Sequence, residues 1–181
     1  FDKKSRKVMM RISAGLFVSL FAIGLACPDG ELCMNTDCGS CGNACCRLSI
    51  TVSESTDDAM NLINASIHDG GPDGAYAPSM TYEGTDGFAD LRPYEKPIDF
   101  IGQTIHTTLA PNYFNDSISF TIAPAQAGKT GSIIYAFSYS LIAGAYCDDG
   151  QNYFNIMSLL SSIEWSSSLK VAGDGSCPAP E

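Results

Sequence analysis

The sequence predicts an α+β fold, in which an antiparallel sheet carries two helices packed on one face and follows a small disulfide-rich segment. Three observations support this prediction. Several runs alternate apolar and polar residues with a period of two, which is typical of strands with one buried face. Two other runs repeat apolar residues at spacings of three and four, as amphipathic helices do. Six of the eight cysteines lie within residues 27–46, ahead of all these runs.

The first 26 residues have the parts of a secretory signal. Five basic residues up to Arg11 precede a fifteen-residue apolar run, and Gly24 and Ala26 stand where signal peptidase cuts. A membrane-spanning helix needs roughly 20 residues, so residues 1–26 are interpreted as a cleaved signal peptide. The alternative is an uncleaved anchor, with residues 9–26 retained in a membrane. We therefore expect a location in the secretory pathway and outside the cell, or alternatively in a plastid or thylakoid lumen or attached to a membrane.

Residues 27–46 form a Cys-rich module with too few large apolar side chains for a core of its own, so its order depends on disulfides. Six of its cysteines can pair among themselves while Cys147 joins Cys177. Alternatively, one or both of these distant cysteines form disulfides with the module. The sequence does not decide between these connectivities. The expected disulfide cysteines are Cys27, Cys33, Cys38, Cys41, Cys45, Cys46, Cys147 and Cys177.

An α+β domain is predicted over residues 47–181, beginning with a strand over 48–52 that alternates apolar and hydroxyl side chains. Ser55, with Asp58 three residues later, is typical of a helix N-terminus. The apolar spacing that follows extends this first helix to Ile67.

The segment 68–74 is predicted to be a loop because its glycines and proline interrupt both periodicities. Weaker strands follow over residues 76–82 and 99–109. Alternating runs at 117–122 and 133–141 flank a glycine-containing turn and predict a hairpin. One face of its second strand carries Ile133, Tyr135, Phe137, Tyr139 and Leu141.

The last predicted helix begins at a cap on Asp149 and continues to Ile163. Asp148, Asp149 and Asn152 also bring carboxylate and amide oxygens to one helix start, where they could hold calcium. Capping and loop hydrogen bonds already explain these residue types. The simpler expectation is therefore no cofactor, and calcium is the metal to test.

Catalytic residues are not predicted, because no motif of known mechanism surrounds His68 or His106, the two histidines. This favours a protein that is not an enzyme. The alternative is a secreted hydrolase that uses His106 with Asp148 or Asp149, and it requires these groups to lie within hydrogen-bond reach.

Two N-glycosylation sequons occur, at Asn64-Ala-Ser66 and Asn115-Asp-Ser117. They are acceptor sites if the host is eukaryotic.

The net charge is −10 at pH 7, and five of the ten basic residues fall in residues 1–26. The remainder is therefore more acidic still, and its few Lys and Arg residues are scattered. Nucleic-acid binding depends on clustered basic residues, so a nucleic-acid partner is rejected. A protein partner fits better, and a membrane is a partner only if the leader is retained.

The run Phe114-Asn-Asp116-Ser-Ile118-Ser-Phe120 resembles the Phe-x-Asp-x-Val-x-Phe strand of the domain-of-unknown-function 1499 family. Ser138-Tyr-Ser140, Gly144 and Asp148-Asp-Gly150-Gln-Asn152 are similar to that family's Ser-x-Ser-Arg, Gly and Asp-x-Gly-x-Asn signature, which opens its last helix. The likeness covers residues 47–163, with its specific motifs in 114–152.

Two departures from that pattern are visible. Leu141 stands where the family usually carries arginine, and two extra residues separate Ser140 from Asp148. The Cys-rich module is not part of the pattern. The family includes plastid and bacterial envelope proteins without an established activity, so the resemblance implies a fold more than a function.

We therefore expect a secreted or lumenal, non-catalytic interaction or structural protein that is stabilised by disulfides. Its alternatives are the hydrolase and a membrane-anchored accessory subunit of a larger complex, which could be a plastid complex.

Overall fold

The computed structural model describes residues 41, 43–80, 86–126, 129–145, 148, 150–174 and 176–177. The leader 1–26, Cys27, Cys33, Cys38, Cys147 and Asp149 lie outside the described residues, and so do the predictions made for them. The elements, in chain order, are β1 (Cys45–Val52), α1 (Thr56–His68), β2 (Tyr76–Pro78), β3 (Phe88–Asp90), the short 3-10 helix η1 (Arg92–Tyr94), β4 (Phe100–Thr107), β5 (Asn115–Pro124), β6 (Ser132–Ser140), α2 (Gln151–Ser161) and β7 (Lys170–Gly173).

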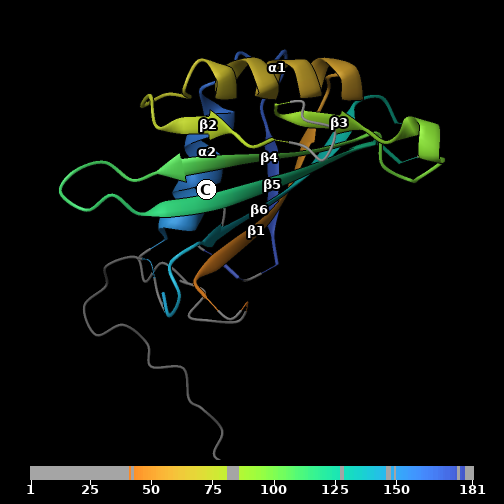
Figure 1. Cartoon of the computed structure of the whole chain (residues 1–181). Helices are drawn as coiled ribbons and strands as arrows, with labels where there is room; N and C mark the ends of the chain where they lie inside the picture. Colours follow the sequence, from red (N-terminus) through yellow and green to blue (C-terminus); the bar gives the residue numbers. More distant parts are fainter. Residues whose placement is uncertain are drawn as a thin grey trace, which may run out of the picture. The chain divides into compact units, whose positions relative to one another are not determined.

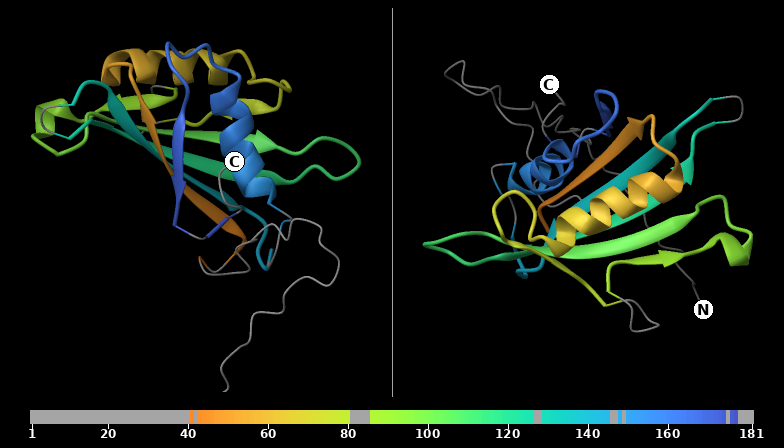
Figure 2. Two further views of the ribbon diagram at one scale, coloured as in Figure 1. Left: turned by 180° about the vertical axis from the view of Figure 1, so that it is seen from behind. Right: turned by 90° about the horizontal axis from the view of Figure 1, so that it is seen from above.

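The strands form one antiparallel sheet in the order β2-β4-β5-β6-β1-β7, with β3 also pairing with β4. Both α-helices pack on one face of this sheet, as the sequence predicts. Figure 1 shows the four long strands in front of α2, and the left panel of Figure 2 shows α2 in front of the sheet. We call the face that packs against α1 and α2 the covered face, and the opposite one the open face.

The start of α1 follows the predicted cap. The Ser55 hydroxyl accepts a hydrogen bond from the Asp58 backbone N–H at 3.2 Å and donates one to the Asp58 carboxylate at 2.7 Å. The start of α2 differs from the prediction by one residue. Its N-cap position is Gly150 in the left-handed conformation, and the Asp148 carboxylate accepts the N–H groups of Gly150 and Asn152. Asp148 therefore provides the capping oxygen atoms that were expected of Asp149.

The core lies between the covered face and the two helices. Alternate residues of β1, β5 and β6 point into it, as do the apolar residues of α1 and α2. The fully buried side chains include Ile50, Ile63, Ile67, Ile118, Phe120, Ile122, Ile134, Ile156, Leu159 and Leu160. This cluster fixes the pairing register, because a shift by one residue would turn these side chains to the open face.

Most predicted elements are present, with changes at their ends. The predicted hairpin is β5–β6, and the first strand begins at Cys45, so the last two cysteines of residues 27–46 lie in the sheet. The strand predicted over 76–82 is shorter, at Tyr76–Pro78. The sequence did not predict β3, β7 or η1, which span only three or four residues each. Such short elements cover too few residues for a periodicity to be visible.

Candidate binding face

The open face combines aromatic, hydroxyl and amide side chains. Antiparallel pairing places Tyr135 opposite Thr121 and Ser49, and Phe137 opposite Ser119 and Arg47. The same alternation assigns these positions of the long strands and β7 to the open face: Cys45, Arg47, Ser49, Thr51, Ile101, Gln103, Ile105, Thr107, Asn115, Ser117, Ser119, Thr121, Ala123, Ile133, Tyr135, Phe137, Tyr139, Lys170 and Ala172. None of these strand positions is a carboxylate, although the chain has a net charge of −10.

Two hollows lie side by side on the open face and share Ser119 and Thr121 of the central strand β5. The first, of about 420 Å³, is lined by Tyr135, Phe137 and Arg47, with Asp174 beyond the end of β7. The second, of about 570 Å³, is lined by Tyr94, Ile101, Met80 and Gln103, among others. Tyr135 is 48% exposed and Tyr94 is 59% exposed, so each hollow presents one accessible tyrosine.

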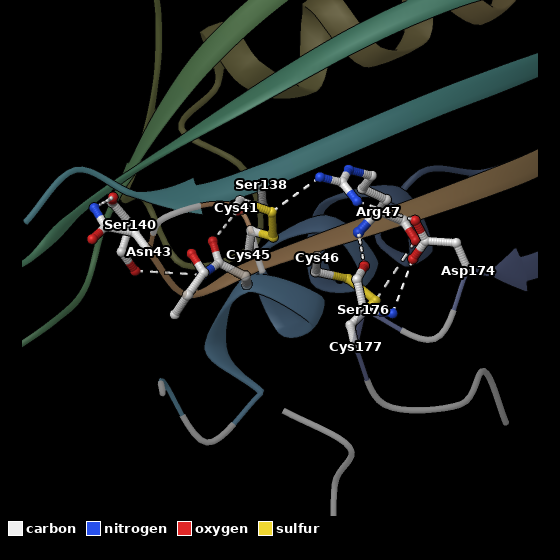
Figure 3. The surroundings of a disulfide bond; sticks show 12 residues. Cys41, Asn43, Cys45, Cys46, Arg47, Ser138, Ser140, Asp174, Ser176 and Cys177 are labelled. Carbon is white, nitrogen blue, oxygen red and sulfur yellow. Dashed lines mark hydrogen bonds and ion pairs between the residues drawn. A yellow bond between two sulfur atoms is a disulfide. The ribbon is translucent and has the colours of Figure 1, made fainter. Parts of the chain in front are cut away.

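Arg47 organises the first hollow. Its guanidinium carbon lies 5.3 Å from the centre of the Phe137 ring, a cation–π distance, and Phe137 stacks on Tyr139 with ring centres 5.4 Å apart. Nη1 donates to the Asp174 carboxylate at 3.4 Å and Nη2 donates to Cys41 Sγ at 3.1 Å, as Figure 3 shows. These contacts hold a long cationic side chain against the sheet and reduce its freedom before any ligand arrives.

Asp174 is held in place by the segment that follows β7. Hydrogen bonding from the Ser176 side chain, followed by the Ser176 backbone N–H and Arg47, lowers the pKa of Asp174 below its ordinary value. The Ser176 hydroxyl in turn accepts the Arg47 backbone N–H at 2.9 Å. The wall of the first hollow is therefore built by segments that are 129 residues apart in the chain.

Two disulfides are formed by the described cysteines, Cys41–Cys45 and Cys46–Cys177. The second bridge decides part of the pairing that the sequence left open, because a distant cysteine reaches back to the cluster instead of joining Cys147. The two disulfides extend from opposite faces of β1, because Cys46 belongs to the core and Cys45 is one of the open-face positions. Figure 3 shows both bridges beside the first residues of β1.

A second group of polar side chains is buried under α2, on the covered face. The Ser138 hydroxyl donates to Asn152 Oδ1 at 2.5 Å, and Asn152 Nδ2 donates to the Ala44 carbonyl, to Ser140 Oγ and to the Asp148 carboxylate. Asn155 Nδ2 donates to the Asp116 carboxylate at 2.8 Å. Because each of these groups has a partner, the network can be buried without large cost.

His106 lies at the edge of this network. Its Nε2 is 3.0 Å from the Asp73 carboxylate, and its ring lies beside Tyr76 with centres 4.5 Å apart. It is 4% exposed, and its Nδ1 has no hydrogen-bond partner among the described residues. Burial raises the pKa of Tyr76, and the charge of Asp73 raises it further. The carboxylate bonded to His106 is thus Asp73, whereas the hydrolase alternative pairs His106 with Asp148 or Asp149. Asp149 lies outside the described residues, and that alternative stays a prediction.

The proposed calcium ligands are used within the protein. Both Asp148 oxygen atoms and the Asn152 amide are engaged in the hydrogen bonds that begin α2, and Asp149 lies outside the described residues. Within the described ranges, no group of three or more His, Cys, Asp or Glu side chains is placed to hold a metal ion. Calcium binding therefore stays a prediction.

The two sequons differ in their surroundings. Asn115 is exposed at the first position of β5, where its Oδ1 accepts the Thr107 hydroxyl at 2.8 Å. Asn64 packs against Gly87, since a Cβ atom added to Gly87 would lie 2.1 Å from Asn64 Oδ1. If glycans are attached, the folded protein offers Asn115 more readily than Asn64.

The open face was not predicted as a site from the sequence. The alternation in 133–141 places the large residues on one side of the strand but does not say whether that side faces the core. The necessary signal was the pairing of Pro124 with Ser132 across the turn, which places Ile122 opposite Ile134. With that register, Tyr135 must face away from the core.

Comparison of the chain with models of known families, with curated proteins and with solved structures found no match. The resemblance to the domain-of-unknown-function 1499 family therefore stays an expectation. The residues that carry it do meet in space, because Ser138, Ser140, Asp148 and Asn152 belong to one buried network. In the part of the chain that the structure describes, no helix has the length and apolar character needed to cross a membrane.

Proposed function

We propose that this protein is a secreted or lumenal, disulfide-stabilised binding protein without a catalytic role, and that it recognises a protein partner on the open face. The observation that carries the proposal is the face itself. It exposes Tyr135 and Tyr94 beside two hollows, carries Arg47 over Phe137, and has no carboxylate at the open-face positions of its long strands and β7. Asp174 and Asp90 are the carboxylates among the residues that line the two hollows.

The composition of the open face supports a protein partner. The centres of protein interfaces are enriched in aromatic residues, Met and Arg and depleted of other charged residues. Tyrosine and serine together are typical of antibody paratopes, which bind proteins through rigid aromatic contacts and adaptable hydrogen bonds. Tyr135, Phe137, Met80 and Arg47 fit the first pattern, and Ser49, Ser119 and Thr121 supply the hydroxyls.

The buried polar network supports a structural role for Asp148 and His106, which the hydrolase alternative makes catalytic, and for Asn152, a candidate calcium ligand. Asp148 and Asn152 fix the start of α2, and His106 is buried against Asp73. A general base has to reach a substrate proton directly or through one water, whereas His106 is 4% exposed.

The test places a photo-crosslinking phenylalanine analogue at Tyr135 and, as a matched control, at Phe154. These residues are 48% and 43% exposed, but Phe154 lies on α2, on the other side of the sheet. The full chain is incubated with extracellular material from its source, and any adduct is identified. We expect a specific protein adduct at position 135 and none at 154.

The identified partner is then purified, and its Kd is measured for the wild type, Tyr135→Ser and Phe154→Ser. We expect Tyr135→Ser to raise Kd at least about tenfold, as loss of an interface hot spot does, and Phe154→Ser to leave it within about twofold. No adduct at 135, equal losses in both variants, or a partner that proves to be a free glycan would overturn the proposal.

A further inference from the structure

The end of the sheet at which β4 stops and β5 starts carries a group of exposed apolar side chains. Leu109, Tyr113 and Phe114 lie on the connection between the two strands, and Leu141 and Ile142 follow β6 at the same end. They are between 41% and 72% exposed, and Tyr113 is the most exposed of the five. We call these five residues the apolar end.

The backbone of this connection is held by its own polar groups. The Thr108 N–H donates to the Phe114 carbonyl at 2.8 Å, and the Thr108 hydroxyl accepts the Phe114 N–H and donates to the Asn112 carbonyl. The Leu141 N–H donates to the Asn115 carbonyl at 2.9 Å, which joins the two segments. Polar groups are therefore paired internally while the apolar side chains point outward. Figures 1 and 2 show the connection extending beyond the ends of its neighbouring strands.

The apolar end is also uncharged. No residue in 107–115 or in 132–145 is charged, in a chain with 20 acidic and 10 basic residues. Asp116, the next carboxylate after the connection, is 2% exposed and accepts a hydrogen bond from Asn155. Exposed apolar side chains gathered at one end of a sheet are a candidate interaction site.

The chain joins the fold at this same end. The Ser140 N–H donates to the Ala44 carbonyl, and the Asn43 side chain donates to the Ser140 carbonyl and accepts the Gly144 N–H. The forty residues that precede Cys41 include the basic and apolar leader. A membrane-binding test at this end therefore uses a chain whose N-terminus has been determined, because a retained apolar leader would bind lipid by itself.

We propose that the apolar end docks into the interfacial region of a zwitterionic lipid bilayer. Amphipathic residues such as tyrosine favour the membrane–water interface, and leucine and phenylalanine favour the acyl boundary below it. These two segments carry no charged side chain that would have to be dehydrated, and the nearby carboxylates Asp73 and Asp148 are engaged with His106 and with the start of α2. Five partly exposed side chains present a few hundred Å², which is less than the roughly 800 Å² that each partner contributes to a stable protein interface. A lipid surface needs no such complementary area.

This proposal is independent of the partner on the open face. It also predicts how vesicle binding should depend on anionic lipid and on salt. A chain of net charge −10 gains nothing from anionic lipid, so binding to phosphatidylcholine vesicles should not increase with added phosphatidylserine and should vary little with salt.

The test uses the full secreted chain, with its N-terminus determined, and phosphatidylcholine vesicles in a sedimentation assay. The double variant Leu109→Ser/Tyr113→Ser is compared with Met80→Ser/Tyr94→Ser, which removes equally exposed side chains, Met80 at 71% and Tyr94 at 59%, away from the apolar end. We expect the first to lower the partition coefficient at least about tenfold, and the second to bind as the wild type does.

A second measurement gives a result whether or not the leader is retained. Tyr113→Trp and Tyr94→Trp are each made in a Trp165→Phe background, which removes the single natural tryptophan. Brominated phosphatidylcholine should quench emission from position 113 and not from position 94. Absence of quenching at position 113, or equal quenching at both positions, would overturn the proposal. So would self-association without vesicles that Leu109→Ser/Tyr113→Ser abolishes, because the occupant of the apolar end would then be a second copy of the chain.

Discussion

The covered and open faces of the sheet are made from alternate residues of the same strands. Side-chain size alone would place the large aromatic residues of β6 in the core, but they lie on the open face. In β6 the covered face carries Ile134, Ala136 and Ser138, whereas the open face carries Tyr135, Phe137 and Tyr139. The small residues let α2 approach closely, and Ser138 bonds directly to Asn152 on that helix. The aromatic residues remain outside, where a packing requirement does not explain them. Position on the strand, and not hydrophobicity, therefore separates the stabilising face from the candidate binding face.

The two disulfides also differ in the face of β1 from which they extend. Removing each of them should give the largest difference in unfolding free energy between the two faces. Cys46–Cys177 joins the core and closes a sequence separation of 131, whereas Cys41–Cys45 leaves from the open face and closes one of 4. Loop entropy grows with length, so Cys46→Ala/Cys177→Ala should cost about 2–5 kcal/mol and Cys41→Ala/Cys45→Ala less than half as much.

Urea unfolding of the two double variants checks this ranking, and each variant keeps an even number of cysteines. Equal losses of unfolding free energy would mean that the core bridge does not constrain the unfolded chain more than the local one does.

Neighbouring residues of β6 provide the most direct comparison of the faces. Ile134 is fully buried and Tyr135 is 48% exposed. Ile134→Ala should lower the free energy of unfolding by about 2–5 kcal/mol because it leaves a cavity in the core. Tyr135→Ala should lower it by about 1 kcal/mol or less. Chemical denaturation with a constant m-value measures both. A Tyr135→Ala loss comparable to that of Ile134→Ala would show that the open face is covered in solution.

Removing a polar contact should also cost more unfolding free energy on the covered face than on the open face. Asn155→Ala removes the donor to Asp116, a carboxylate that is 2% exposed, and should cost about 1–3 kcal/mol. Gln103→Ala removes a 3.0 Å contact to Ser117 at the margin of the second hollow and should cost about 0.5 kcal/mol or less. The same unfolding experiment separates them, and a larger loss for Gln103→Ala would contradict the assignment of the buried network as the stabilising one.

Sequence patterns predicted those elements whose signals are local. The Ser55 and Asp58 pair predicted the start of α1, and the alternating runs around residues 125–131 predicted the β5–β6 hairpin. The start of α2 was displaced by one residue because Asp148 and Asp149 offer the same capping chemistry, and only the left-handed Gly150 decides between them.

The rest depends on contacts between distant residues. The partner of Cys46 is 131 positions away, and Asp174 reaches Arg47 only through β7, a strand of four residues. The open face needs the register of several strand pairs before its side chains can be grouped. No local pattern contains that information, which is why the buried network and the hollows were found only in the structure.

The smallest expected effect concerns Asp174 and pH. The pKa of Asp174 is lowered in the folded protein by hydrogen bonds from Ser176 and by Arg47, so its carboxylate stabilises the fold at pH values above the ordinary Asp pKa of about 3.9. That contribution is lost as the pH falls through the lowered folded value. Because the Asp174 and Arg47 side chains are about half exposed, solvent screens the effect and it should be small.

Asp174→Asn isolates this group from the other carboxylates. Urea midpoints measured between about pH 6 and 2 should favour the wild type slightly at the upper end, and the difference should vanish at the lower end. A difference that grows on acidification would have the wrong sign for a lowered pKa. The wall of the first hollow would then be held by Ser176 and the Cys46–Cys177 bridge without help from the Asp174 charge. In that case the Kd for a partner on the open face should not change as the pH falls.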